Sequence, residues 1–263
     1  MPSSLKRVSV AGALFCCLAG FGLLSAHATE TACRQDRSDE TVQVAYIHDG
    51  DTLWLKDGRK VRIIGINTPE LARKEHPAEP LAELARDELR QLLGKSATIQ
   101  LRQDKEETDH YGRLLAHVFM NKGINISEWL LRRGLAYAIS IPPNLWQMDC
   151  YQRAEQNARS HNKGLWSGKV DRVLEANSLS DDIRGFQIIR GRIRNISHSR
   201  NTVWLNFNKQ FAVRILRKDL TWFKEMDFEK LTGKPLEVRG WVQYHTRQLR
   251  MRIKHPAAIH ILP

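Results

Sequence analysis

A series of short apolar runs, separated by turn residues between positions 40 and 120, constrains the fold more than any other feature of the sequence. Runs of this length, bounded by Gly, Pro and Asp, are typical of strands. Asp57-Gly58 lies between two of the runs and is a strong hairpin signal. Strands are therefore expected at residues 41–47, 52–55, 61–66, 97–101 and 114–119.

One helix is expected to interrupt this series. Apolar residues recur at helical spacing over residues 81–92, after Pro80 and before Gly94. Residues 103–113 are polar and are expected to form a long loop. Five strands with one helix among them predict a small β-barrel in a mainly β, α+β protein.

Two further helices are expected after the barrel. Asn125 and Glu128 have the spacing of a capping box, which predicts a helix from there to Gly134. Another helix is expected over residues 148–162. Residues 40–169 are accordingly expected to form one domain with about three helices, preceded by a short segment at 29–39.

The strand pattern returns in the last third of the chain. Residues 170–184 are rich in Asp and Ser and poor in large apolar residues, which predicts a linker. Residues 220–231 are expected to be helical, and residues 195–201 and 244–248 to be polar turns. Strands are expected at 187–196, 202–207, 211–216, 236–242 and 249–253. This pattern resembles an OB-fold, which implies a second small β-barrel over residues 185–263, of the same type as the first.

The N-terminus has the form of a secretory signal. Lys6 and Arg7 precede an uncharged run over residues 8–24, and Ala26-His27-Ala28 has the small-x-small form of a cleavage site. We expect residues 1–28 to be removed by cleavage after Ala28, which would leave a secreted or periplasmic protein with no stable membrane span. A retained membrane anchor is the alternative, because the run is near the lower limit of what spans a bilayer.

Export also affects how the cysteines are interpreted. Cys16 and Cys17 leave with the signal, and Cys33 and Cys150 remain as an even pair. Because disulfides persist outside the cytosol, a bond between these two is the simplest prediction. Two unpaired buried thiols are the alternative.

Charge is distributed unevenly along the chain. Residues 183–263 contain 17 basic and 5 acidic residues, whereas residues 29–182 contain 22 basic and 24 acidic ones. An excess of this size in the last third indicates a polyanionic partner such as DNA or RNA. A basic surface that only aids solubility is the alternative.

Candidate chemistry gathers in the first domain. Hydrolysis of a phosphodiester requires a cation, a base for water and donors for the phosphate oxygens. Arg62 is the most informative single residue, because a guanidinium in an apolar strand is costly unless it reaches an anion. The other candidates are the segments Asp49-Gly50-Asp51-Thr52, Asn67-Thr68-Pro69-Glu70 and Asp109-His110-Tyr111-Gly112-Arg113.

In this order and spacing, the segments resemble the thermonuclease family typified by staphylococcal nuclease. The resemblance covers residues 40–168, about half of the chain, and includes Gly134-Leu135-Ala136 and Gly164-Leu165-Trp166 near its end. It implies a nuclease that hydrolyses phosphodiester bonds of DNA or RNA with Ca²⁺ and leaves 3′-phosphates.

The resemblance also implies roles for individual residues. Asp51 corresponds to a carboxylate ligand of Ca²⁺, and Thr68 supplies a backbone carbonyl to the same ion. Glu70 corresponds to the general base for the attacking water. Arg62 and Arg113 correspond to the two arginines that bind the phosphate, where planar bidentate donors suit the geometry. Tyr111, next to Arg113, is expected to contact the substrate.

Two departures from the family pattern affect the expected binding. Asn67 stands where the family has a second aspartate on the metal, so the site has one negative charge fewer. Calcium affinity depends on the charge of the ligands, which predicts weaker Ca²⁺ binding or a changed metal preference. Ser140 and Pro142 stand in the region of the family's nucleotide-stacking tyrosines, which leaves base preference open.

The second barrel is expected to bind nucleic acid. Alternate positions in a strand face one side, so Arg190, Arg192 and Arg194 are predicted to share a face, with Arg250 as a further contact. A solvated outer face is the alternative.

A monomeric nuclease with an accessory basic barrel is the first expectation. The alternatives are a nucleic-acid-binding envelope protein with a catalytically weak barrel, and an envelope protein that binds acidic surface polymers.

Overall fold

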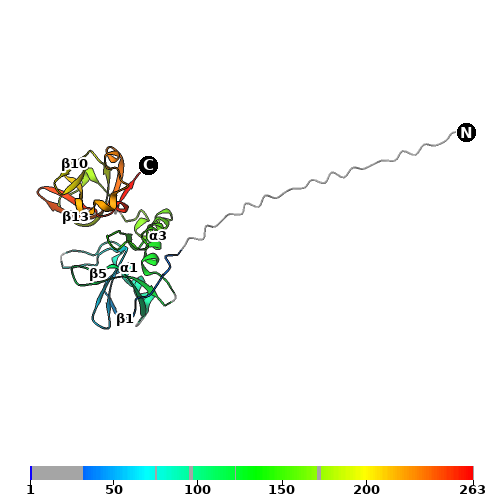
Figure 1. The fold of residues 1–263 in the computed structure, drawn as a ribbon. Coiled ribbons are helices and arrows are strands. Elements are labelled where there is room, and N and C mark those ends of the chain that lie inside the picture. Colours follow the sequence, from blue (N-terminus) through cyan, green and yellow to red (C-terminus); the bar gives the residue numbers. More distant parts are fainter. Residues whose placement is uncertain (2–31, 75, 95–96, 122, 171–172, 263) are drawn as a thin grey trace. The chain divides into compact units, whose positions relative to one another are not determined.

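The first half of the chain is built on a closed five-stranded β-barrel. The computed structural model describes residue 1 and residues 32–262, apart from 75, 95–96, 122 and 171–172. Within this range the barrel order is β1-β2-β3-β6-β5, with β3 and β6 parallel and the other neighbours antiparallel (Figure 1). The strands are β1 (Glu40–Ile47), β2 (Thr52–Leu55), β3 (Lys60–Ile63), β5 (Thr98–Thr108) and β6 (Leu114–Met120). The predicted barrel is confirmed.

The predicted helices pack beside this barrel and share its core. They are α1 (Ala82–Leu93), α2 (Ile126–Arg132) and α3 (Met148–Ser160). Leu89 of α1, Leu130 of α2 and Ala154 of α3 are fully or almost fully buried in the same apolar cluster as the barrel strands. Asn125 accepts a hydrogen bond from the Glu128 N–H, which confirms it as the N-cap. The capping box is incomplete, because the Glu128 carboxylate accepts from the Cys33 N–H instead.

Two expectations about the strands are corrected. The expected strand 61–66 ends at Ile63, and the chain turns at Gly65, whose φ is +85°. A Cβ on Gly65 would lie 2.3 Å from the Tyr151 ring, so the close approach needs glycine. After the turn, β4 (Ile66–Asn67) pairs with β7 (Tyr137–Ala138). The expected loop from residue 103 is instead strand as far as Thr108, because β5 pairs with β6 on both sides of an irregularity.

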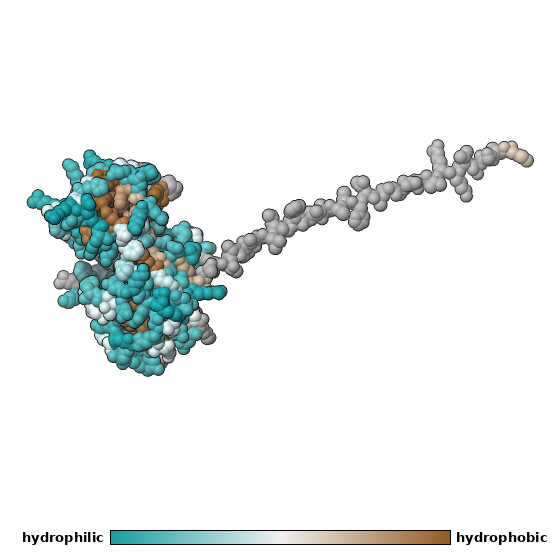
Figure 2. Space-filling view, viewed as in Figure 1, coloured by the Kyte–Doolittle hydropathy of each residue, from teal (hydrophilic) through white to brown (hydrophobic). Residues whose placement is uncertain are grey.

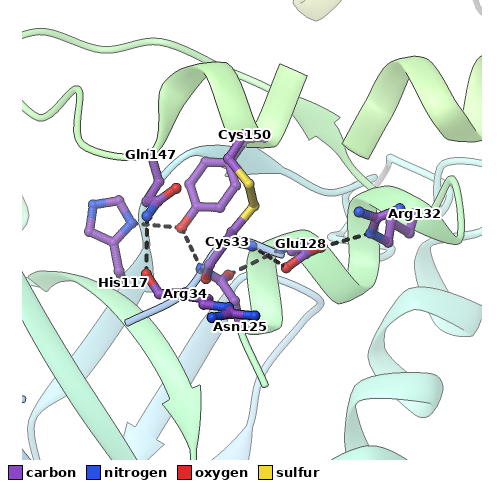
Figure 3. The surroundings of a disulfide bond; sticks show 9 residues. Cys33, Arg34, His117, Asn125, Glu128, Arg132, Gln147 and Cys150 are labelled. Atoms are coloured by element: carbon purple, nitrogen blue, oxygen red, sulfur yellow. Dashed lines mark hydrogen bonds and ion pairs between the residues drawn. A yellow bond between two sulfur atoms is a disulfide. The ribbon is translucent and has the colours of Figure 1, made fainter. Parts of the chain in front are cut away.

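The predicted disulfide between Cys33 and Cys150 is present (Figure 3). It ties the segment before β1 to α3, across 117 positions of sequence. Buried polar groups surround it: the Tyr151 hydroxyl lies 2.8 Å from His117 Nδ1 and accepts from the Asn125 side chain at 3.1 Å. Asn125 also donates to the Cys33 carbonyl, so a buried hydrogen bond holds the backbone beside the disulfide.

The last third of the chain repeats the strand order of the first barrel. Its path in one eight-stranded sheet is β10-β11-β12-β14-β13-β9-β8, in which β12–β14 and β8–β9 are parallel, and β15 pairs with β13 off this path. Since β9 and β10 are consecutive, they act as two parts of one opening strand that pairs with β13 at one end and β11 at the other. The strands are β8 (Val173–Glu175), β9 (Gly185–Arg192), β10 (Asn195–Ser199), β11 (Thr202–Asn206), β12 (Phe211–Leu216), β13 (Pro235–His245), β14 (Gln248–Arg252) and β15 (Ile259–Ile261).

Several boundaries in this half differ from expectation. The expected polar turn at 195–201 is mostly strand β10, because Asn195–Ser199 pairs with β11. The expected helical stretch is a pair of 3₁₀ segments, Arg217–Phe223 and Glu229–Leu231. The expected linker contains β8, which pairs with β9. The domain boundaries at 169 and 185 stay a prediction.

The two halves meet through a small apolar cluster and a buried ionic network. Tyr137 and Leu165 from the first half pack with Phe186 and Ile188 from the second. Beside them, both carboxylate oxygens of Glu155 in α3 accept from Arg239 Nη1 of β13 at 2.7 and 2.8 Å. These side chains are buried, so their pairing occurs at low dielectric.

Glu237 is the second carboxylate of this network. It accepts from Arg159 at 2.8 Å and from Arg190 at 3.0 Å. Burial raises the pKa of Glu237, but the hydrogen bond and charge of Arg159, with the charge of Arg239, outweigh burial and hold the pKa at about 2.

The surface is largely hydrophilic. Figure 2 shows hydrophilic residues over most of the visible face, with hydrophobic residues gathered in places over the C-terminal sheet. No helix in the described ranges is both long and apolar enough to cross a membrane. The predicted signal, residues 1–28, lies outside the described residues except for Met1.

Replacement of Arg239 by Leu tests the buried network. The change leaves the Glu155 and Glu237 carboxylates buried with one cation fewer, and we expect a loss of about 3–5 kcal/mol in the free energy of unfolding. Urea denaturation followed by tryptophan fluorescence measures it. Arg200→Leu, at an exposed turn, is the control. A loss below about 1 kcal/mol for Arg239→Leu would show that the network contributes no more than a surface ion pair.

Candidate active site

The candidate metal ligands lie together at the end of β4 and in the turn between β1 and β2. Asp51 Oδ2 accepts a hydrogen bond from the Thr68 N–H at 2.9 Å, and Thr52 Oγ1 donates to Asp51 Oδ1 at 3.1 Å. All three residues are buried. Gly50 makes this approach possible, because a Cβ there would lie 2.7 Å from the Thr68 side chain. The turn therefore presents Asp51 directly to the segment 67–68.

Arg62 points into the same cluster. Its Nη2 lies 3.1 Å from Asp51 Oδ2 and 3.4 Å from Asn67 Oδ1. Its Nη1 donates to the Ile63 carbonyl at 2.6 Å. The guanidinium in the apolar strand thus reaches an anion. The side-chain oxygens of Asp51 and Asn67 thus face the same point, which Arg62 Nη2 occupies.

The donor set fits a hard divalent cation. Asp51 offers a carboxylate, Asn67 an amide oxygen and Thr68 a backbone carbonyl, and these are the ligand types that Ca²⁺ prefers. Among the described residues, no group of three or more His, Cys, Asp or Glu side chains is placed to hold a metal ion. A cation at this position therefore depends on amide and carbonyl oxygens beside its carboxylate.

Asp49 is a buried member of the cluster, and the sequence pattern assigned it no individual role. Its Oδ1 accepts from the Asp51 N–H at 3.0 Å. Burial and the neighbouring Asp51 charge raise the pKa of Asp49 to about 7. The Asp-Gly-Asp sequence indicates a turn, but only the fold shows that the turn is buried against β4.

Glu70 lies at the edge of this cluster and is held by its own loop. Its carboxylate pairs with Arg73 at 3.0 Å, and its N–H donates to Glu79 at 3.2 Å. Desolvation raises the pKa of Glu70, the Arg73 charge opposes the rise and the Asp51 charge adds to it. The side chain is still 56% exposed, so water reaches the carboxylate. Arg73 is a further residue that the sequence pattern gave no reason to select.

Arg113 and Tyr111 lie on the turn between β5 and β6. Arg113 Nε and Nη2 both approach Asp109 Oδ2 at 2.8 Å, and its guanidinium is 5.6 Å from the centre of the Tyr111 ring. The pKa of nearby His48 is lowered mainly by burial and also by the charges of Arg73, Lys60 and Arg113, while the Asp51 charge opposes this.

The structure thus brings Asp51, Arg62, Asn67 and Thr68 into direct contact. Glu70 is within electrostatic reach of Asp51 and Arg62 and is paired with Arg73 on its own loop. Arg113 is paired with Asp109 on its own loop and has no hydrogen bond or ion pair with these four among the described residues. The catalytic and metal-binding roles of these residues stay a prediction.

Arg190 and Arg192 lie at alternate positions of β9, as expected, and their role in binding stays a prediction. β9 ends at Arg192, so Arg194 lies beyond the strand. Arg190 is paired with Glu237, and Arg192 donates to the Gly233 carbonyl. Arg250 lies on another strand, β14, with its guanidinium 5.0 Å from the centre of the Trp204 ring.

Comparison with known proteins gives matches to the first half of the chain. A family model described as staphylococcal nuclease homologue matches residues 60–168. A thermonuclease of Staphylococcus hyicus is 33% identical over 141 residues, which cover 52% of this chain and 82% of that protein. A thermonuclease of Staphylococcus intermedius is 32% identical over 135 residues, covering 50% and 79%. Endonuclease YncB of Bacillus subtilis (strain 168) is 36% identical over 124 residues, covering 45% and 58%.

The pH dependence of stability tests the environment of Asp49. Because the pKa of Asp49 is raised in the folded protein, the native state binds more protons than the unfolded chain between about pH 4 and 7. The stability that this proton uptake contributes is fully present below about pH 4 and is lost as pH rises through about 7. Asp49→Asn should therefore gain stability relative to the parent as pH increases over this window, by roughly 4 kcal/mol at most. Urea unfolding in chelator at several pH values measures the gap. Asp149→Asn, at an exposed position, is the control. A gap that is independent of pH would contradict the prediction.

Proposed function

The chain belongs to the staphylococcal nuclease family, and from this membership we propose that it is an exported nuclease that hydrolyses DNA or RNA with a bound divalent cation, Ca²⁺ in the first place. Its class follows from the family: it is a phosphodiester-hydrolysing endonuclease. The observation that carries the finer proposal is the contact of Arg62 with the oxygens of Asp51 and Asn67 in one buried cluster.

We propose that Asp51, Asn67 and the Thr68 carbonyl hold the cation. A divalent ion supplies positive charge that stabilises the charge developing on the phosphate oxygens. The hydrogen bond from Thr68 N–H fixes Asp51 Oδ2 before any ion arrives, which limits the rearrangement that binding requires. Arg62 Nη2 faces the same oxygens, so we expect it to turn toward the substrate phosphate when an ion binds.

Glu70 is the proposed general base. Its raised pKa makes its carboxylate a stronger proton acceptor than an ordinary glutamate, and its exposure gives water access. The ion pair with Arg73 holds the side chain near the cluster. This pair must loosen for Glu70 to accept a proton from water.

Arg62 and Arg113 are proposed to bind the scissile phosphate and to stabilise its pentacoordinate transition state. Arg113 presents two nitrogens, Nε and Nη2, to one oxygen of Asp109. The same two nitrogens can bind a phosphate oxygen in place of Asp109. Asp109 thus keeps the guanidinium oriented until substrate displaces it. Release of 3′-phosphates is part of the proposal and rests on the family alone.

Export is supported by the disulfide. A bond between Cys33 and Cys150 persists in oxidising compartments and is rare in the cytosol. We propose a secreted or periplasmic location with removal of residues 1–28, and a second barrel that raises the local concentration of nucleic acid around the site.

One observation favours a second candidate, a nucleic-acid-binding protein with weak catalysis. Arg62 Nη2 faces the side-chain oxygens of both Asp51 and Asn67, so a cation would have to displace it. Asn67 is uncharged and adds no electrostatic attraction for the cation. Cleavage assays and Ca²⁺ titration separate the two candidates.

Glu70→Gln removes the proposed base and keeps the size of the side chain. We expect the rate of plasmid cleavage with Ca²⁺ to fall by about 10²–10⁴-fold, with unchanged thermal stability. Glu83→Gln, an exposed glutamate of α1, is the control and should cleave like the parent. Equal activity of the parent and Glu70→Gln would contradict the assignment. Inactivity of the parent with Ca²⁺, Mg²⁺ and Mn²⁺ would favour the binding protein.

Asn67→Asp restores a second negative charge to the proposed metal site. Because Ca²⁺ affinity depends on ligand charge, we expect the Ca²⁺ concentration for half-saturation to fall about tenfold, measured by titration calorimetry. Thr68→Ser should bind like the parent, since its proposed ligand is the backbone carbonyl. Unchanged affinity in Asn67→Asp would show that Asn67 is not a ligand.

A further inference from the structure

Three neighbouring strands of the second barrel place a tryptophan and a set of arginines side by side. Trp204 of β11 is opposite Arg214 of β12, and Arg214 is opposite Arg252 of β14. Arg250 follows in the next outward position of β14, opposite Ala212. The row therefore runs across the strands and continues along β14.

This row lies on the outer face of the sheet. Successive strand residues point to opposite faces. Val203 and Leu205 of β11, Val213 and Ile215 of β12 and Met251 of β14 all belong to the buried core of this barrel. The residues between them point away from that core. Trp204, Arg214, Arg250 and Arg252 are each partly exposed. We call these four residues the outer row.

The outer row has more positive charge than its neighbours neutralise. Arg252 pairs with Asp219 at 2.8 Å. Arg250 contacts Gln248 Oε1 and His245 Nδ1, neither of which is a carboxylate. Arg214 has no carboxylate partner among the described residues. Burial lowers the pKa of Arg214, and the charges of Arg252 and Arg250 lower it further. The row thus bears a like-charge repulsion that an anion would relieve.

Trp204 adds a surface for stacking within this charged row. Its indole is half-buried, and the Arg250 guanidinium lies 5.0 Å from the ring centre. The polar side chains of Asn206 and Ser197, which hydrogen-bond to each other at 3.0 Å, extend the outer face beside it. The indole and the guanidinium of Arg214, which has no carboxylate partner among the described residues, thus lie on the same outer face.

We propose that the outer row binds a single strand of nucleic acid, with one base stacked on Trp204 and the adjacent phosphates held by Arg214, Arg250 and Arg252. The proposal rests on the proposed function, in which nucleic acid is the substrate.

The spacing of the row favours an unpaired strand over a duplex. Neighbouring strands are about 4.8 Å apart, so phosphates on either side of a base stacked on Trp204 lie within reach of arginines one and two strands away. Stacking on a side chain needs an unpaired base face, which a duplex does not offer along its length. Among the described residues, Arg214 has no carboxylate partner of the kind that holds Arg190, which pairs with Glu237 in the buried network.

Binding is measured separately from cleavage. Fluorescence anisotropy of a labelled 12-residue oligothymidylate is recorded with the full chain carrying Glu70→Gln, in chelator, over a range of salt concentrations. Trp204→Ala and Arg214→Gln are added in this background, and Lys224→Gln removes an exposed charge of the same barrel outside the three strands. A hairpin duplex and heparin serve as the other polyanions. Thermal unfolding of each variant confirms folding, and Trp204→Phe retains an aromatic ring if Trp204→Ala does not fold.

We expect Trp204→Ala and Arg214→Gln each to weaken oligothymidylate binding by at least fivefold, Trp204→Phe to weaken it less, and Lys224→Gln to change it by less than twofold. Arg214→Gln should also reduce the salt dependence. Equal effects of Arg214→Gln and Lys224→Gln would overturn the proposal, because binding would then follow net charge. An unchanged Kd in both Trp204 variants, or tighter binding of duplex or heparin with the same dependence on Trp204, would also overturn it. If the parent cleaves nucleic acid but the Trp204 and Arg214 variants bind oligothymidylate as tightly as their background does, this inference is refuted and the proposed nuclease function is not. The binding assay does not depend on cleavage.

Discussion

The buried pairing of Glu155 and Glu237 with arginines from both halves is the interaction on which the rest of the structure depends. Two carboxylates away from water are tolerated only because Arg239, Arg159 and Arg190 surround them. The same network reaches the candidate site. Glu155 accepts from the Ala138 N–H and Arg239 donates to the Ala138 carbonyl, while Ala138 and Tyr137 pair with Ile66 and Asn67. The second barrel therefore stabilises β7, and β7 pairs with β4, which contains the proposed metal ligand Asn67.

Charge pairing also positions the side chains of the candidate site. Arg62 contacts Asp51, Glu70 contacts Arg73, and Arg113 contacts Asp109. Each pair holds a proposed site residue beside an opposite charge, which lowers the cost of any burial. Asp49 is the exception, and its carboxyl instead keeps its proton up to about neutral pH.

Much of this fold follows from local signals in the sequence. Turn chemistry at Asp57-Gly58, the N-cap at Asn125 and the helical spacing over 81–92 predicted elements that the structure contains, because these signals act within a few residues. The cysteine pairing followed from there being only two cysteines after the predicted signal. Features that depend on distant partners were not predictable. The extension of β5 to Thr108 requires β6, and the neutralisation of Arg190 requires Glu237, 47 positions away. The burial of Asp49 depends in the same way on how its turn packs, whereas Arg73 pairs with Glu70 only three positions away.

The position of the disulfide has a consequence for how the two halves are joined. Both cysteines precede β9, so the covalent link lies wholly within the N-terminal half. Cys150 lies in α3, and the same helix contains Glu155, which accepts from Arg239 of the second barrel. The covalent link therefore restrains the helix on which the second barrel docks.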